Sequence, residues 1–570
     1  MDNNRFWKKN YDAGIDDLDP ALWEVTLIDS FKKTFQEFPD RIALVFMGVE
    51  ITYGQLDIYA QRFAGYLRDN GFKKGDVIGI NLPNIPEYII GYLGILRAGC
   101  IVSGVSPLLS QEELVFQLQD SNARGLITLD AIYEKKLYPV AHKLPSLKFV
   151  CVTSIGSFMP AVKSFIGKLI GKIPKGKVEP IDAISIKWFA DIVKNKNYSA
   201  EPFDAGLTPD DIAYIQYTGG TTGVPKGAMI SHRNALSDLI IVQTWLLIDR
   251  GGNNALSAFP LFHIAGLFTN SVFINSGLTQ ILIPNPRDTD HICSELKKYK
   301  PFFTANVPSL YHLLMGNPKF KKLDHSTLHV CVSAAASYPE ESQKQLEEII
   351  GQGKLLEAYG MTETSPLTTM NPTRGKKKLG TIGLPLMNTD IRLLDPSTGE
   401  EVPPGEPGEI CIKGPQVMVG YYNKPEETAQ VIDARGYLHT GDVAVQDSDG
   451  FLRIVDRTKD MINVSGFKVF SKKIEEILTE HPAIELIATI GIPDPEKPGS
   501  EMVKAFVKLF DGFDYGGDID VLKEDIISFA REKLSPFEVP KVVEFRKELP
   551  LTSVGKLDKK QLRKEEQQVR

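Results

Sequence analysis

The chain has 570 residues and a mass of 63.3 kDa, so a prior of about 150 residues per domain predicts roughly two to four domains. Hydrophobic residues make up 42% and charged residues 24%, a balance typical of globular proteins that excludes disorder for most of the length. With 65 basic and 72 acidic residues the formal net charge is −7, so we expect no nucleic-acid binding.

The N-terminus and the cysteines both indicate a cytoplasmic protein. Residues 1–5 are polar and lead into no apolar segment, so no signal peptide is expected. The cysteines are odd in number, widely scattered and in no metal-binding spacing, which argues against a disulfide framework or a structural zinc. They are Cys100, Cys151, Cys293, Cys331 and Cys411.

Alternating elements in the first two-thirds of the chain predict a mixed α/β fold with largely buried strands. Short apolar runs predict strands, and amphipathic stretches between them predict helices. The predicted strands are 42–47, 76–80, 125–129 and 328–332, and the predicted helices are 53–68, 87–97, 292–299 and 340–350. The segment 253–286 carries no formal charge apart from His263, but Pro260 and several amides interrupt it. We expect it to form core strands and a helix instead of a membrane span.

The sequence pattern changes near residue 388, where predicted short strands alternate with turns rich in Gly and Pro. This pattern predicts a β-rich subdomain over about 388–455. A second α/β pattern follows, with helices at 471–481 and 520–534 and strands at 487–491 and 503–509. We therefore predict a large domain over 1–455 and a smaller α+β domain over 456–570, whose residues from Lys559 onward form a frayed tail.

The strongest local signal is a Gly- and Thr-rich loop that leaves the strand predicted at 212–216. Glycines let a backbone curl round an anion, while hydroxyl and amide groups bind phosphate oxygens. A lysine near its end adds a fixed positive charge. The residues that carry this signal are Thr218, Gly219, Gly220, Thr221, Thr222, Gly223 and Lys226. No Ser or Thr follows a Gly-Lys pair here, so the loop is not a Walker A motif.

This loop resembles the phosphate loop of the adenylate-forming superfamily, which includes acyl-CoA synthetases, luciferases and nonribosomal adenylation domains. Further motifs follow in the superfamily's order over nearly the whole chain. They are Tyr359–Glu363, Leu438–Asp442, Asp456–Asp460 and Val554–Lys556. The stretch 436–459 is especially similar to the signature of fatty acyl-CoA synthetases, and bacterial long-chain fatty acid–CoA ligases are the nearest group.

The resemblance implies a role for each matching residue in binding ATP. Residues 218–226 would hold the β- and γ-phosphates, and Glu363 would hold Mg²⁺ with Thr218. Thr362 would touch the α-phosphate, and Lys556 would be the catalytic lysine. The adenosine part of the site would be formed by Ala335, Tyr359, Gly360, Met361, Asp442 and Arg457.

The resemblance also implies an acyl gate at Phe262 and His263, a hinge at Asp456 and a loop for the CoA step at Ser465 and Gly466. The chain departs from the superfamily pattern in three places. Alanines replace the usual glycines in the segment 333–337, Ser471 stands where Pro is usual, and Lys473 stands where Glu is usual. The alanines leave open how closely the backbone approaches adenine, and the changes at Ser471 and Lys473 leave the fine contacts of the CoA step open.

We therefore expect an ATP-dependent ligase that joins a medium- or long-chain fatty acid to coenzyme A, with ATP, Mg²⁺ and CoA as cofactors and co-substrates. An aryl or arylpropanoid acid–CoA ligase is the alternative enzyme. The shape of the acyl channel decides between the two, and a single sequence does not show that shape. A nonribosomal adenylation domain is disfavoured because no carrier domain follows residue 570. An inactive, lipid-binding relative at the membrane surface is the non-enzymatic alternative. The sequence leaves a homodimer open.

The segment from Ser157 to Lys177 suggests a peripheral membrane contact. Seven apolar residues recur at helical spacing, and five lysines accompany them with no acidic residue before Glu179. Such a helix could lie on an anionic membrane surface. The alternative is an ordinary amphipathic helix packed on the core.

Overall fold

The computed structural model describes residues 5–160, 167, 171, 173–218, 224–465, 467–514, 516–550 and 557–569. The predicted site residues Gly219–Gly223, Gly466 and Lys556 lie outside this range, as do residues 161–166, 168–170 and 172 of the segment from Ser157 to Lys177. The chain divides into two compact units. The first comprises Met1–Asp390, Ile412–Leu438 and Asp449–Phe451, and the second comprises Ile391–Cys411, His439–Ser448 and Leu452–Arg570.

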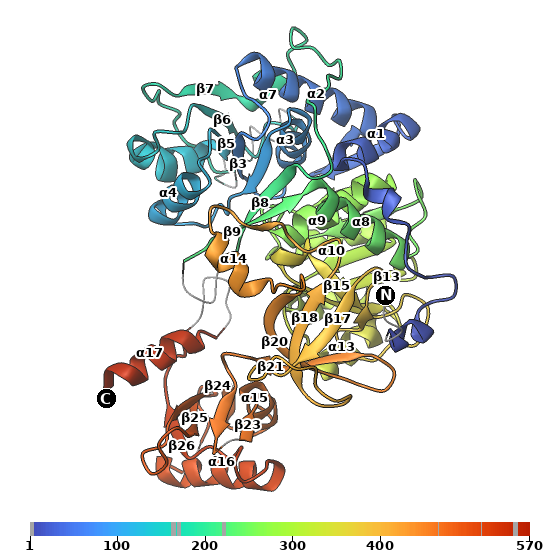
Figure 1. The fold of residues 1–570 in the computed structure, drawn as a ribbon. Coiled ribbons are helices and arrows are strands. Elements are labelled where there is room, and N and C mark those ends of the chain that lie inside the picture. The colour runs from blue at the N-terminus through green and yellow to red at the C-terminus, as the bar shows by residue number, and fades with distance from the viewer. Residues whose placement is uncertain are drawn as a thin grey trace. The chain divides into compact units, whose positions relative to one another are not determined.

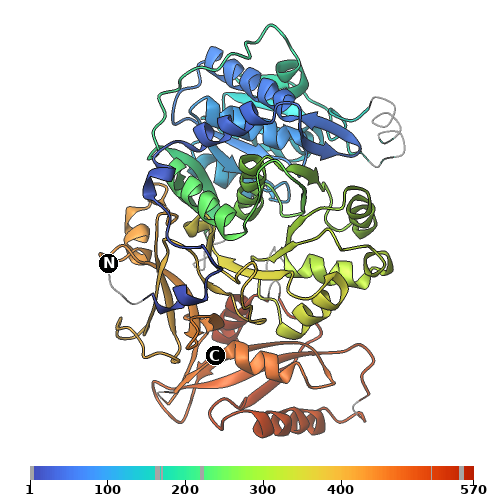
Figure 2. The same ribbon diagram turned by 90° about the vertical axis from the view of Figure 1, so that its right-hand side faces the viewer.

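Two large sheets form the frame of the first unit (Figures 1 and 2). Both have parallel centres and antiparallel strands at an edge, as expected for buried strands joined through helices. In spatial order the nine-stranded sheet is β16 (Leu384–Pro385), β15 (Leu367–Met370), β14 (Leu355–Gly360), β13 (Val330–Ser333), β12 (Phe303–Asn306), β10 (Asn254–Ser257), β11 (Thr279–Leu282), β1 (Ile42–Phe46) and β2 (Val49–Thr52). The eight-stranded sheet is β19 (Gly420–Tyr421), β9 (Lys226–Ser231), β8 (Ile212–Thr218), β4 (Ile101–Gly104), β3 (Val77–Asn81), β5 (Gly125–Leu129), β6 (Phe149–Thr153) and β7 (Ser185–Trp188).

The helices of the first unit build one large apolar core with these sheets. The helices are α1 (Leu27–Glu37), α2 (Tyr53–Asp69), α3 (Pro86–Arg97), α4 (Gln111–Asp120), α7 (Phe189–Val193), α8 (His232–Trp245), α9 (Ile264–Ser276), α10 (Thr289–Tyr299), α11 (Pro308–Gly316), α12 (Pro318–Lys321), α13 (Glu340–Ile350) and α14 (Pro425–Val431). Every residue of α3 and of α9 is buried. The core holds Ile90 of α3, Leu239 of α8 and Phe273 of α9 together.

Burial of a carboxyl group in α3 makes the stability of this unit depend on pH. Glu87 is fully buried, Thr153 donates a 2.8 Å hydrogen bond to its Oε1, and its Oε2 has no partner among the described residues. Burial raises the pKa of Glu87 from 4.5 to about 7. Between these two values the folded chain holds a proton that the unfolded chain releases, so stability falls as the pH rises through that window.

We expect Glu87→Gln to stabilise the first unit increasingly from pH 4.5 to 7, by on the order of 3 kcal/mol above pH 7. The amide keeps an acceptor for Thr153 and carries no charge. Urea denaturation at several pH values measures the difference from wild type. Glu341→Gln, at an exposed position on α13, is the control and should show no such pH dependence. A stability difference that is constant with pH would contradict the assignment.

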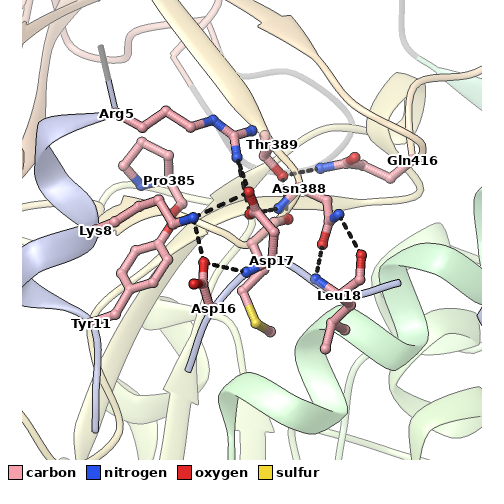
Figure 3. Close-up of polar contacts among 11 residues, drawn as sticks. Arg5, Lys8, Tyr11, Asp16, Asp17, Leu18, Pro385, Asn388, Thr389 and Gln416 are labelled. Carbon is pink, nitrogen blue, oxygen red and sulfur yellow. Dashed lines mark hydrogen bonds and ion pairs between the residues drawn. The ribbon is translucent and has the colours of Figure 1, made fainter. Parts of the chain in front are cut away.

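The N-terminal residues 5–18, called the N-terminal strap below, are hydrogen-bonded to Asn388 (Figure 3). The Asn388 main-chain N–H donates to Asp17 at 2.7 Å, and the Asn388 side chain exchanges two hydrogen bonds with the main chain of Leu18. Arg5 pairs with the same Asp17 carboxylate at 2.7 Å. Further along the strap, Asn10 donates to the main-chain carbonyl of Asp449 at 2.7 Å. The strap thus joins chain segments that are remote in sequence.

The described residues of the second unit form three smaller sheets and three helices. Its four-stranded sheet is ordered β17 (Asp390–Leu394), β18 (Gly408–Lys413), β20 (Leu438–Gln446) and β21 (Leu452–Arg457). A two-stranded sheet pairs β22 (Ile462–Val464) with β23 (Phe467–Val469), and a three-stranded sheet is ordered β24 (Ile484–Pro493), β25 (Glu501–Leu509) and β26 (Val542–Phe545). The helices are α15 (Ser471–Leu478), α16 (Ile519–Lys533) and α17 (Lys559–Val569).

The structure confirms the predicted α/β class and the core location of residues 253–286, which form β10, α9 and β11. The prediction of a frayed tail from Lys559 was wrong. Those residues form α17, because Leu562 is fully buried beside Phe506 and Lys559 pairs with Glu475 at 2.8 Å. Within the described ranges, none of the helices combines the length and the apolar character that crossing a bilayer requires. The domain boundary at Asp456 concerns which parts move together, and it stays a prediction.

Candidate functional site

The two ends of the Gly- and Thr-rich loop are fixed by the β8–β9 hairpin. Thr218, the last residue of β8, pairs with Lys226, the first residue of β9. The Lys226 ammonium lies 3.3 Å from a Glu427 carboxylate oxygen and 5.1 Å from the centre of the Tyr421 ring. The lysine side chain is therefore held in place at the base of the loop, and its charge is compensated there.

A buried carboxylate lies on the other side of the same tyrosine. Glu363 is 5% exposed, and the Tyr421 hydroxyl donates a 2.7 Å hydrogen bond to its Oε1. Burial and the neighbouring Glu363 carboxylate raise the pKa of Tyr421, so this hydroxyl stays a donor. The main-chain carbonyl of Glu363 also accepts from the amide of Met418 at 2.8 Å. Tyr421 thus brings together the predicted phosphate-binding lysine and the predicted metal-binding carboxylate.

The turn that carries Glu363 is determined by close main-chain packing. A Cβ atom on Gly360 would lie 1.7 Å from the carbonyl oxygen of Pro366, so only glycine fits there. Asp238 accepts a 2.9 Å hydrogen bond from the amide of Leu367, and burial raises the pKa of Asp238 well above its usual range. Tyr359 is buried at the end of β14, and Thr362 is buried next to Glu363. These contacts hold the predicted adenine and metal residues in one turn.

A small apolar pocket lies beside this turn. Helix α9 contributes one wall, and β12, β13 and the segment 366–370 contribute others. The pocket is lined by Val242, Leu246, Phe259, Ala265, Phe268, Thr269, Val272, Phe303, Ala305, Val332, Ala334, Pro366, Leu367 and Met370. The next residue after Ala334, Ala335, has a left-handed backbone (φ 70°), a conformation that favours the glycine of the superfamily pattern.

The two predicted gate residues directly precede the helix that lines this pocket. His263 is exposed and caps α9, where its Nδ1 accepts from the amide of Ala265 at 3.3 Å. Phe262 is half-buried and packs against the main core. The structure thus explains His263 locally as a helix cap, and its gating role stays a prediction.

The second unit carries the predicted ribose-binding residues. Asp442 on β20 lies opposite Arg457 on β21, and the two side chains form an ion pair at 3.0 Å. Asp442 is 8% exposed, and the main chain of Thr458 donates to the carbonyl of Gly441 at 2.8 Å. The carboxylate therefore has a fixed position at the start of this strand pair.

The predicted hinge residue is tied to one of the departures from the superfamily pattern. The buried carboxylate of Asp456 accepts from both the amide and the hydroxyl of Ser471, the latter at 3.1 Å. Burial raises the pKa of Asp456. Another departure, Lys473, pairs with the buried Glu538 at 2.6 Å. Ser465 adopts a left-handed backbone (φ 54°), and its amide donates to Ser500 at 2.8 Å.

Restoring the superfamily proline at position 471 should weaken the second unit. Ser471 is the first residue of α15, where proline is well tolerated by the helix. However, Ser471→Pro removes both donors to Asp456, so we expect a loss of about 2 kcal/mol in stability. Ser471→Ala keeps the amide donor and should lose about half as much. Urea denaturation followed by hydrogen exchange in α15 measures both, and equal losses would show that the amide contributes nothing.

Sequence reasoning did not single out Tyr421 or Asp238. Tyr421 lies 58 residues from the carboxylate that it contacts, and Asp238 lies 129 residues from Leu367. The residues next to them in the sequence therefore do not indicate either contact. A signal did exist for Asp238, because a single acidic residue stands in the apolar run 235–242. An acid in such a run is expected to be buried and paired.

Comparison with known proteins identifies the family and the fold. A family model described as AMP-binding enzyme matches residues 31–422, and one described as AMP-binding enzyme C-terminal domain matches residues 473–556. A long-chain-fatty-acid–CoA ligase of Escherichia coli O6:H1 is 38% identical over 98% of both chains, and one of Bacillus subtilis is 38% identical over 99% of both. The crystal structure of the anthranilate CoA ligase AuaEII with anthranoyl-AMP has a TM-score of 0.80 at 24% identity. It covers 96% of this chain and 99% of its own, a likeness of fold.

Proposed function

Because the chain belongs to the AMP-binding enzyme family, we propose that it is an AMP-forming ligase that joins a medium- or long-chain fatty acid to coenzyme A. The observation that carries the fatty-acid assignment is the apolar pocket beside the Glu363 turn. Its lining is aliphatic and aromatic, with Thr269 as the single hydroxyl-bearing side chain in the set. Such a lining suits an alkyl chain with its carboxylate directed toward the turn.

In the first half-reaction, a carboxylate oxygen of the fatty acid attacks the α-phosphorus of ATP, and the bond to pyrophosphate breaks. Residues 218–226 hold the β- and γ-phosphates, with Lys226 as the fixed charge, and the Thr362 hydroxyl binds the α-phosphate. Lys556 compensates the charge that develops as pyrophosphate leaves. Mg²⁺ fits this site because a single buried carboxylate, Glu363, and the Thr218 hydroxyl provide the oxygen ligands that it prefers beside phosphates. When bound, it neutralises phosphate charge.

The superfamily motifs assign separate roles in binding the adenosine part of ATP. Tyr359 stacks on adenine beside Gly360, Met361 and Ala335, whose main chain approaches the base. Asp442 accepts hydrogen bonds from the ribose hydroxyls, and its ion pair with Arg457 orients the carboxylate.

In the second half-reaction, the thiolate of CoA attacks the acyl carbonyl carbon, and AMP leaves. The two half-reactions use different nucleophiles, and a C-terminal domain in one fixed position cannot serve both. Residues 456–570 therefore rotate about Asp456 between the two steps. Ser465 and Gly466 then belong to the loop that serves the CoA step.

The test of this function is an AMP-release assay with fatty acids of increasing chain length and with benzoates, each with and without CoA. We expect turnover with long-chain acids, and thioester product when CoA is present. Turnover confined to benzoates or arylpropanoids would establish the aryl alternative. Absence of pyrophosphate release with every acid would establish an inactive, lipid-binding relative.

Narrowing the pocket should change chain-length preference. Val272→Phe adds bulk to the α9 wall, so the ratio of kcat/KM for palmitate to that for octanoate should fall by at least about tenfold. Ile274→Phe is the matched control, since Ile274 is also buried on α9 but is absent from the pocket lining. Equal ratios in Val272→Phe and wild type would place the alkyl chain elsewhere.

We further propose a cytoplasmic enzyme whose segment 157–177 contacts anionic lipid. Phe158 and Ile173 are both buried, so these two members of the apolar stripe anchor the ends of the segment to the protein, while Lys175 and Lys177 are exposed. Vesicle flotation should show binding that requires anionic lipid and weakens with salt. Binding that is unchanged after Lys163, Lys168, Lys172, Lys175 and Lys177 are replaced by Gln would remove the membrane role.

A further inference from the structure

Three side chains with metal-binding chemistry meet on the four-stranded sheet of the second unit. Glu409 and Cys411 are two residues apart on β18 and so point to the same face, and His439 lies on the neighbouring strand β20. The His439 Nδ1 atom is 3.0 Å from Glu409 Oε2 and 3.4 Å from Cys411 Sγ. One possible ligand atom from each residue lies within 4.8 Å of the other two. The three side chains converge on one point.

This donor set has a clear preference among cations. Thiolate, imidazole and carboxylate are the ligands of zinc and of similar transition metals, whereas Mg²⁺ prefers oxygen ligands alone. A thiolate and a carboxylate balance the charge of a divalent ion, so occupancy would bury no net charge. Cys411 is fully buried and Glu409 is 9% exposed, while the His439 side chain is 29% exposed. The histidine side is thus open for entry and for a water molecule as fourth ligand.

Linear spacing did not predict this cluster, because Cys411 and His439 are 28 residues apart. Strand pairing brings them together, and the Thr440 hydroxyl donates to the carbonyl of Ile410 at 2.8 Å beside them. In the described part of the chain, no other group of three such side chains meets the same geometric criterion. The other four cysteines are buried away from any cluster of this kind among the described residues.

We propose that Glu409, Cys411 and His439 form a binding site for one zinc-class divalent cation, separate from the Mg²⁺ that accompanies ATP. The site is coupled to the proposed ribose ligand on β20, because Glu409 Oε1 accepts a 2.8 Å hydrogen bond from the amide of Gly441. Gly441 directly precedes Asp442, the proposed ribose ligand. A cation that recruits the Glu409 carboxylate therefore acts on the part of β20 that carries Asp442.

The test is a Co²⁺ titration of the chelator-treated full chain without nucleotide. We expect one equivalent to bind with a thiolate-to-cobalt absorption band, to be displaced by Zn²⁺ and to be unaffected by excess Mg²⁺. Cys411→Ser should abolish the band. His439→Gln should weaken Co²⁺ binding by at least about tenfold, because losing even an outer-shell partner costs that much.

Cys293→Ser is the matched control, since it removes another buried thiol and should leave the band unchanged. His439→Gln alters a partly exposed side chain, so it tests the site even if the buried Cys411 variant fails to fold. No thiolate band in the wild-type protein, or an equal affinity in wild type and His439→Gln, would overturn the proposal. Failure of the ligase assay would leave this result unaffected, because the titration uses no substrate.

Discussion

Replacing Lys556 by alanine should slow acyl-adenylate formation by about 10²–10³-fold, the range observed when one preorganised stabilising group is removed. Thioester formation from supplied acyl-adenylate should stay close to wild type. The physical reason is that negative charge must be compensated while pyrophosphate leaves, and this need has passed when the thiolate attacks the carbonyl. Rapid-quench measurement of the two half-reactions separates the effects.

Lys560→Ala is the matched control for this experiment. Lys560 is an exposed lysine four positions further along, so its removal should change neither half-reaction. A loss of equal size in both half-reactions of Lys556→Ala would contradict the assignment, because it would indicate a structural role instead of a role in adenylation.

Glu363→Gln should have a comparable effect for a different reason. The change keeps the shape of the side chain and an acceptor for the Tyr421 hydroxyl but removes the charge that binds the cation. We expect adenylation to fall by about 100-fold or more and the Mg²⁺ concentration at half-maximal rate to rise. Pyrophosphate release measured across a Mg²⁺ titration tests both.

Tyr421→Phe separates the charge of Glu363 from its orientation. This variant keeps the carboxylate and loses the 2.7 Å hydrogen bond that positions it, so the Mg²⁺ requirement should rise by about tenfold with a smaller loss of maximal rate. If Glu363→Gln retained the wild-type Mg²⁺ dependence, Glu363 would not be the metal ligand.

Local sequence patterns predicted the fold class because the strands are short apolar runs, whereas the helices between them carry apolar residues at helical spacing. The apolar run 42–47 became β1 over Ile42–Phe46, and the amphipathic run 53–68 became α2 over Tyr53–Asp69. The site motifs were recognisable for a related reason, since each is a continuous segment. The turn around Glu363 and the part of β20 around Asp442 carry their chemistry within a few residues.

Contacts between distant segments could not be predicted in this way. Tyr421 positions Glu363, and Ser471 holds Asp456, through tertiary packing that neither sequence neighbourhood encodes. The C-terminal segment is strongly charged, which favours a frayed tail by composition. One leucine, Leu562, and the ion pairs of Lys559 and Arg563 are sufficient to order α17 against its unit.

The N-terminal strap also has a consequence for synthesis on the ribosome. Asn10 is translated 439 residues before its partner Asp449, an interval of roughly 20 to 90 s at about 5–20 residues per second. During that time Trp7, which is 3% exposed in the folded chain and packs beside Gly450, lacks this contact. The strap is therefore secured only late in synthesis, and until then Trp7 is available to chaperones.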